Sequence, residues 1–280
     1  MYTAKYWRRL RWGSSMAINP DYSETKVIET VAVAIRTFYE KLTAKLNELK
    51  IDKLTNKNPY LYRAKSIESA AEFIETALSA HISSSEETIF GNDFFEPIAI
   101  AVTGGQKSCA KGIDVEVQKE DRKFAIAVKS GKGILNANAQ ESQDRHFFNA
   151  GKLADQADLK FKGILGYSFG RLKSGKQGKP RHYEELAGQK FWSCLTGDDE
   201  FYLKLLDYMG DSPERFKADF DSAYEKAKNR LIRDFTNTFC QEDGSIDWKK
   251  LVEDSSKEEK PPTEKSPTEK PKRKKAPKNA

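Results

Sequence analysis

An acidic and an amine side chain that could act together on a phosphate lie in a predicted β-hairpin over residues 112–130. Apolar residues alternate with polar or small ones along this stretch, GIDVEVQKEDRKFAIAVKS, which is the periodicity of paired strands. With residues 121–122 in the turn, Asp114 would lie opposite Lys129, and both side chains would leave the same face of the sheet. Beside a glycine that opens the backbone, Gly131, this pair suits metal-assisted hydrolysis of a phosphodiester. The acid would hold the cation, and the amine would stabilise the phosphate or position the attacking water. The alternative is an ordinary cross-strand ion pair on a solvated hairpin.

Two further acids could complete such a site. In the register given above, Glu116 would lie opposite Ala127, on the face of the acid–amine pair. Glu96 stands just before Pro97 in an expected helix over residues 83–103, and its neighbours are mostly apolar. A carboxylate in such surroundings requires a hydrogen-bonding partner or a metal ion, unless a kink at Pro97 turns it toward solvent.

Polar and basic residues after the hairpin are candidates for contact with nucleic acid. A helix is expected over residues 136–157, and the amides near its start could contact phosphates or base edges, although the first of them could equally cap the helix. Residues 160–181 contain seven basic residues and no acidic one, and residues 171–181 read as a mobile basic loop or as a solvated hairpin tip. The residues expected to contact DNA are Asn136, Asn138, Gln140, Arg145, Arg171, Lys173, Lys176 and Arg181.

The composition argues against several classes of protein. No apolar run approaches the roughly 18 residues of a membrane span, and residues 1–15 lack the apolar core of a secretory signal. The three cysteines and three histidines are scattered, without the spacing of a zinc site or a Ser/His/Asp triad, which fits a reducing cytoplasm. Of the net charge of +6, residues 1–15 carry +4 and residues 255–280 carry +5, so the remaining body carries −3. Binding to DNA must therefore use a local basic patch.

The 280 residues are enough for one large or two small domains. Apolar residues recur every three or four positions in the long segments of expected helix, and residues 160–170 read as a strand buried on both faces in the middle of a mixed sheet. The helices are expected over residues 24–50, 66–82 (with Ser66 as the cap), 83–103 and 212–239, with a short last helix over 244–254; a loop or strand is expected over 58–65, and a strand followed by two helices over 182–210.

Five motifs, in their order along the chain, resemble the core of the PD-(D/E)XK nuclease superfamily, and within it the type II restriction endonucleases. They are NPYLYR, TIFGNDFFEPIAIAV, GIDVEV with FAIAVKSGKGILNANAQ, ILGYSFG and GQKFWSCLTGD, and they span about residues 55–205. The resemblance implies an α/β fold with a mixed α+β sheet, a PD-(D/E)XK restriction-endonuclease-like core, with extra long helices at both ends. We expect a flexible basic arm over residues 1–15, a single nuclease domain with helical additions over 16–254, and a disordered Lys/Pro-rich tail over 255–280.

The resemblance also implies roles for individual residues. Asp114 matches the metal-binding Asp of the superfamily, Lys129 its catalytic Lys, and Glu96 an accessory acid on the preceding helix. The usual pattern has Asp or Glu two residues before the Lys, where this chain has Ala127. Glu96 or Glu116 could replace the missing acid: the resemblance favours Glu96, and the expected register favours Glu116.

The activity that the resemblance implies is that of a type II restriction endonuclease. It would cleave double-stranded DNA at a specific sequence and leave 5′-phosphate ends. A homodimer in the cytoplasm would carry out the reaction with Mg²⁺ on Asp114, Glu96 and the Val128 carbonyl. Neither a membrane nor a nucleotide cofactor is expected to take part. The alternatives are a structure-specific or repair nuclease of the same fold, a DNA-binding protein whose nuclease site has decayed, as Ala127 suggests, and a scaffold protein that merely contains a hairpin.

Overall fold

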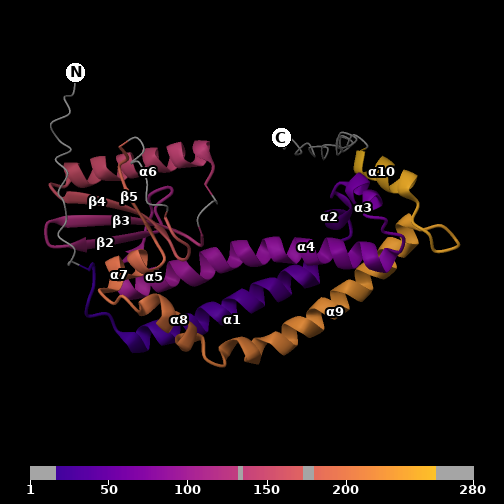
Figure 1. Cartoon of the computed structure of the whole chain (residues 1–280), viewed down its shortest axis with the longest axis horizontal. Coiled ribbons are helices and arrows are strands. Elements are labelled where there is room, and N and C mark those ends of the chain that lie inside the picture. Colours follow the sequence, from indigo (N-terminus) through magenta and orange to yellow (C-terminus); the bar gives the residue numbers. More distant parts are fainter. Residues whose placement is uncertain (1–16, 132–134, 173–179, 257–280) are drawn as a thin grey trace, which may run out of the picture.

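The protein is elongated, with a β-sheet at one end and long helices that extend away from it (Figure 1). The computed structural model describes residues 17–131, 135–172 and 180–256. The expectations for residues 1–15 and for residues 257–280 of the tail therefore fall outside the described residues. No helix in the described part of the chain is long and apolar enough to cross a membrane.

The five-stranded sheet is mixed, with its strands in the order β1-β2-β3-β4-β5. β1, β2 and β3 are antiparallel neighbours, whereas β3, β4 and β5 run parallel. A mixed α/β fold with β4 inside the sheet is as the sequence predicted. The strands are β1 (Gln106–Lys107), β2 (Val115–Lys119), β3 (Arg122–Lys129), β4 (Lys160–Tyr167) and β5 (Glu184–Ala187).

The register of the central hairpin differs from the predicted one by two residues. Val115 pairs with Ile126 and Glu116 with Ala125, so the turn consists of residues 120–121. Glu120 adopts a φ of 51° there, a left-handed conformation that a two-residue hairpin turn demands. The predicted pairing of Glu116 with Ala127 is therefore wrong, and so is the register that placed Asp114 directly opposite Lys129. Because strand side chains alternate, a shift of two residues leaves every side chain on its predicted face.

Helices cover both faces of the sheet (Figure 1). On one face, Ala125, Ala127 and Leu165 form a core with Phe147 of α6 (Ala137–Gln156). Their counterparts on the opposite face, among them Ile126, pack against α5 (Glu96–Thr103) and α7 (Gln189–Thr196). Alternate apolar side chains of β3 therefore pack into two separate cores, one on each face of the sheet.

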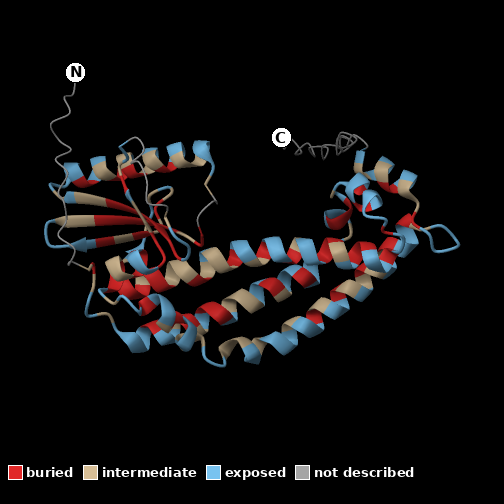
Figure 2. Cartoon of the chain, in the orientation of Figure 1, coloured by how far each residue is buried: buried red, intermediate tan, exposed pale blue. Residues whose placement is uncertain are grey.

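Three long helices carry a third core away from the sheet. Figure 2 shows buried residues along the sides of α1, α4 and α9 that face one another, and these residues include Leu46, Phe73, Leu78, Leu231 and Phe235. The long helices at both ends of the chain are as predicted. The helices of this part are α1 (Glu24–Glu48), α4 (Ala70–Phe90) and α9 (Ser212–Phe239), with α2 (Asp52–Thr55), α3 (Pro59–Ala64) and α10 (Trp248–Ser256) at the far end. Helix α8 (Phe201–Met209) packs with the core beneath the sheet.

Several predicted boundaries are wrong. Ser69, not Ser66, caps α4, since its side chain accepts a hydrogen bond from the amide of Glu72. No new helix starts at residue 83: α4 continues to Phe90 and passes through the π-helical turn η1 (Gly91–Phe95) into α5. Tertiary burial of Ile82 and Ser85 overrides the local cap signal of the serines. The segment expected as a loop or strand over residues 58–65 forms α3.

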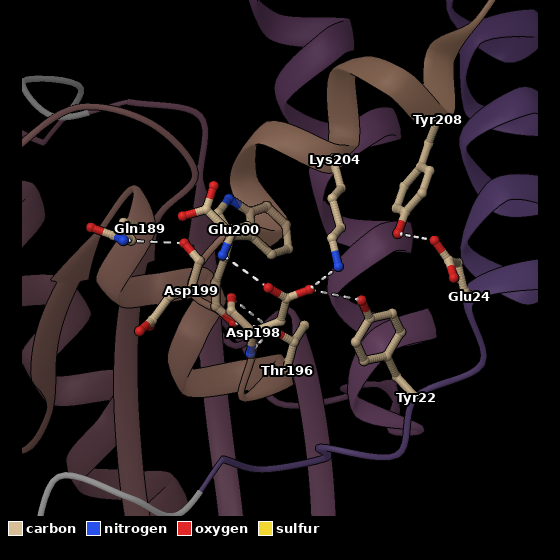
Figure 3. A network of polar contacts seen from close by, with 10 residues as sticks. Tyr22, Glu24, Gln189, Thr196, Asp198, Asp199, Glu200, Lys204 and Tyr208 are labelled. Carbon is tan, nitrogen blue, oxygen red and sulfur yellow. Dashed lines mark hydrogen bonds and ion pairs between the residues drawn. The ribbon is translucent and has the colours of Figure 1, made fainter.

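A polar network fixes the corner where α7 and α8 meet α1 (Figure 3). Asp198 accepts hydrogen bonds from Lys204 Nζ at 2.6 Å and from the amide of Glu200 at 2.9 Å. Tyr22 donates to the same carboxylate at 3.4 Å, and Tyr208 donates to Glu24 of α1 at 2.7 Å. The network ties the segment after α7 to the N-terminal helix and so joins the sheet to the helical arm.

Replacement of this carboxylate should reduce stability in a pH-dependent way. The hydrogen bond from Lys204 holds the pKa of Asp198 below its ordinary value, so its stabilisation is present above that value and is lost as the pH falls through the lowered pKa. We expect Asp198→Asn to lower the free energy of unfolding at pH 7 by about 0.5–1 kcal/mol, because the pair is open to solvent. Urea denaturation at several pH values measures the difference, which should shrink on acidification below the ordinary pKa.

The matched control is Asp219→Asn, at an exposed position on α9. It should show neither the loss at neutral pH nor the dependence on pH. An equal loss for Asp198→Asn at acidic and neutral pH would contradict a role for its charge.

Candidate active site

Asp114 and Lys129 are in contact at one end of the hairpin. Asp114 directly precedes β2 and Lys129 is the last residue of β3. Lys129 Nζ lies 3.2 Å from Asp114 Oδ2, and the two side chains are 23% and 24% exposed. The predicted pair therefore meets despite the changed register, and solvent reaches both groups.

The backbone of Val128 contacts both side chains of this pair. Its N–H donates a hydrogen bond of 2.6 Å to Asp114 Oδ2, and its carbonyl accepts one of 3.0 Å from Lys129 Nζ. The Val128 side chain is buried in the core beneath the sheet, which fixes the position of that peptide. One ammonium nitrogen thus lies within 3.2 Å of a carboxylate oxygen and a backbone carbonyl oxygen.

Glu96 approaches the sheet from the α5 layer. It is the first residue of α5 and directly follows the π-helical turn η1. The next residue, Pro97, has no N–H to donate to the preceding turn. Its Oε1 lies 2.9 Å from Lys107 Nζ on β1, and the Glu96 side chain is only 14% exposed. The apolar surroundings of Glu96 are thus matched by an ionic partner, one of the two outcomes that its sequence context predicted.

Glu116 belongs to a different set of contacts. It accepts a hydrogen bond of 2.6 Å from the Ser108 hydroxyl and forms an ion pair of 2.9 Å with Lys123. Burial raises the pKa of Glu116, but the hydrogen bonds and the charge of Lys123 outweigh it, so that the net pKa is lowered. Ala127, the position of the missing acid, is fully buried in the core with Phe147.

A comparison of the chain with protein families gives a match over residues 25–217 to a family described as type II restriction endonuclease EcoO109I. The matched segment covers well over half of the 280 residues and includes the whole sheet with Glu96, Asp114 and Lys129. The chain belongs to this family of type II restriction endonucleases. It is therefore a nuclease, a hydrolase that binds DNA. No individual curated protein matches the chain.

The amides expected to contact DNA have other partners in this endonuclease. Asn136 caps α6, since its side chain accepts a hydrogen bond of 2.9 Å from the amide of Ala139. Gln140 accepts a hydrogen bond of 2.8 Å from Arg181 Nη2, so two predicted DNA contacts bind one another. Arg181 also donates to Glu185 at 2.9 Å.

The remaining predicted DNA contacts divide by exposure and by position. Asn138, Arg145 and Arg171 are exposed. Lys173 and Lys176 lie outside the described residues. The surface of α6 and the segment after β4 therefore keep exposed side chains that are suited to a duplex, whereas Asn136, Gln140 and Arg181 already have partners within the protein.

Two residues near the site were not singled out from the sequence. Phe169, expected in a buried strand, lies beyond the end of β4 and is 57% exposed, with its ring so close to Gly131 that a Cβ there would lie 2.6 Å from it. Lys107 lies on the edge strand β1 and forms an ion pair with Glu96. The sequence carries no local signal for either contact, because each joins two separate elements of the fold.

Proposed function

We propose that this endonuclease cleaves double-stranded DNA at a specific sequence, in a reaction that depends on Mg²⁺ and leaves 5′-phosphate and 3′-hydroxyl ends. Membership of the restriction endonuclease family supports the class of reaction. The observation that carries the proposal is the position of Lys129 Nζ, which is hydrogen-bonded to both Asp114 Oδ2 and the Val128 carbonyl, at 3.2 and 3.0 Å.

The oxygen atoms of this arrangement fit a hard divalent cation. Asp114 Oδ2 and the Val128 carbonyl both face one ammonium nitrogen, at 3.2 and 3.0 Å, and a metal ion that bound them would displace Lys129 from this position. Carboxylate and carbonyl oxygens are ligands that Mg²⁺ accepts. Within the described ranges, no three His, Cys, Asp or Glu side chains converge as a metal site, so Glu96 would have to leave Lys107 to join.

The protein's own residues would prepare the phosphate for attack. The Val128 N–H orients the Asp114 carboxylate toward the strand end. Lys129 neutralises the negative charge that develops on the phosphate oxygens, or orients the attacking water, with its ammonium already held beside the acid. Bound Mg²⁺ would supply a water of lowered pKa and a polarised phosphate.

Glu96, rather than Glu116, is the second carboxylate in this proposal. Glu116 already has a hydrogen bond from Ser108 and an ion pair with Lys123. It lies opposite Ala125, two residues further along the chain than Asp114. Glu96 has Lys107 as its ionic partner, and that lysine also senses the charge of Asp114.

Sequence-specific cutting would use side chains around the hairpin and a second copy of the chain. The DNA contacts we propose are the exposed Asn138, Arg145 and Arg171, with Asn136, Gln140 and Arg181 available if their present partners exchange, together with Lys173 and Lys176. Arginine reads guanine, and asparagine or glutamine reads adenine, by paired hydrogen bonds in the major groove. Symmetric cleavage of a palindrome requires two sites related by a two-fold axis, hence a homodimer, for which the long helices α1 and α9 offer surface. We place the enzyme in the cytoplasm, where its three free cysteines would stay reduced.

Removal of either member of the central pair should abolish cleavage. We expect Asp114→Asn and Lys129→Met each to slow cutting of plasmid DNA in the presence of Mg²⁺ by about a thousandfold or more, the scale seen when a preorganised charge is lost from an active site. Gel electrophoresis with sequencing of the ends measures the rate and the position of the cuts.

Matched controls lie at the other end of the sheet, in the β2–β3 turn and at the start of β4. Asp121 and Lys160 also form an acid–amine pair, but beside the β2–β3 turn, so Asp121→Asn and Lys160→Met should cut normally. Unimpaired cutting by Asp114→Asn or Lys129→Met would remove the proposed site. Discrete fragments support sequence-specific cleavage, whereas nicks at branched DNA would indicate a structure-specific nuclease and binding without cutting would indicate a decayed site.

The choice of the second acid gives a separate prediction. Glu96→Gln should slow cleavage by about a hundredfold and raise the Mg²⁺ concentration needed for half-maximal rate, because a metal ligand is weakened. Glu116→Gln should change the rate less than about threefold, because its partners are structural. Initial rates measured over a range of Mg²⁺ concentrations decide, and the reverse ranking of the two variants would transfer the role to Glu116.

A further inference from the structure

Lys107 is a surface lysine that reaches a covered carboxylate. Its side chain is 76% exposed, whereas Glu96, which it contacts at 2.9 Å, is 14% exposed. Lys107 pairs with Val115 in the sheet, so its side chain lies on the face that α5 covers. The ammonium thus lies at the open edge of the sheet, between solvent and Glu96.

The charge of this ammonium is felt by more than one acid. A hydrogen bond and the charge of Glu96 raise the pKa of Lys107, and Asp114 and Asp93 add to the rise. Asp93 has its own partner in Lys41, at 2.7 Å. Asp114 has Lys129 on its other side. Glu96 and Asp114, the two carboxylates proposed to bind the metal ion, therefore share Lys107 as a neighbouring cation.

We propose that Lys107 is an exchangeable counter-ion, which holds Glu96 in the enzyme without DNA and releases it when a DNA phosphate binds the ammonium. This inference rests on the proposed function, in which Glu96 is a metal ligand. While Lys107 holds Oε1 of Glu96, the charge of its ammonium disfavours a metal ion at that oxygen, because like charges repel each other. Phosphate binding and metal binding would thereby favour each other.

The exchange has a low energetic cost. Lys107 keeps a charged hydrogen-bond partner throughout, because its exposed ammonium can donate to a phosphate oxygen in place of Glu96. Lys107 then contacts the backbone of the duplex, and Glu96 turns to the metal ion. Because coupling between two ligands is reciprocal, DNA raises the affinity for metal by the same factor by which metal raises the affinity for DNA. In this proposal, the enzyme completes its metal site only when DNA is bound.

The first test is metal binding by the protein without DNA. Lys107→Met removes the ammonium and keeps the length of the side chain. We expect it to bind Mn²⁺ about fivefold more tightly than the unchanged protein, the most that loss of one surface ion pair can give. The electron paramagnetic resonance signal of free Mn²⁺ measures the affinity, and competition with Mg²⁺ extends it to that ion. Lys160→Met, which removes an exposed ion-paired lysine from the other end of the sheet, should bind Mn²⁺ unchanged.

The second test asks whether Lys107 acts through Glu96. In the double variant Lys107→Met with Glu96→Gln, the gain in Mn²⁺ affinity should disappear, because no carboxylate is left to release.

The third test is binding of a duplex without metal. Lys107→Met should make the negative slope of log K against log salt concentration shallower by about 0.9, the value for one phosphate contact. Lys160→Met should leave this slope unchanged. Fluorescence anisotropy measures this slope.

The outcomes separate this inference from the proposed function. An unchanged Mn²⁺ affinity in Lys107→Met, an equal gain in Lys160→Met, or a gain that persists in the double variant would each overturn the role of Lys107. If Asp114→Asn abolishes Mn²⁺ binding and cleavage while Lys107→Met changes neither affinity nor salt slope, only the exchange fails. If Asp114→Asn still binds Mn²⁺ and still cuts DNA, the proposed site itself fails.

Discussion

The acid–amine pair is held in place by the backbone N–H and carbonyl of Val128. The N–H donates to Asp114, the carbonyl accepts from Lys129, and the Val128 side chain is buried among residues of α5 and α7. A backbone group held by a packed core is rigid, so both charged side chains are positioned before any ligand arrives. The hydrophobic layer beneath the sheet is in this sense part of the site.

The acids of the site come from different layers of the fold. Alternation along the strands puts Asp114 on the face that α6 covers, while Glu96 belongs to α5 on the opposite face. The charges of both acids act on Lys107, which lies on the two-residue edge strand β1. The π-helical turn before Glu96 sets the direction from which this carboxylate reaches the edge.

The absence of an acid at Ala127 is compatible with the packing around it. This position is fully buried between β4 and α6, where a carboxylate would need a partner. The long helices α1, α4 and α9 contain a separate core, and the network around Asp198 connects that arm to the sheet. The fold thus combines one end that contains the sheet and the proposed site with an extended helical end.

The sequence by itself determined the hairpin and the face of each of its side chains, so that Asp114 and Lys129 share one face, because strand periodicity is a local property. It also determined the long helices and the mixed sheet, and the order of its motifs indicated the endonuclease family. Only the tertiary structure decided the register, since a shift of two residues leaves the alternation unchanged. It likewise decided that Gln140 binds Arg181, that Phe169 is exposed, and that Glu96 pairs with Lys107. These contacts join distant residues, and their free energies depend on burial and geometry that no local pattern encodes.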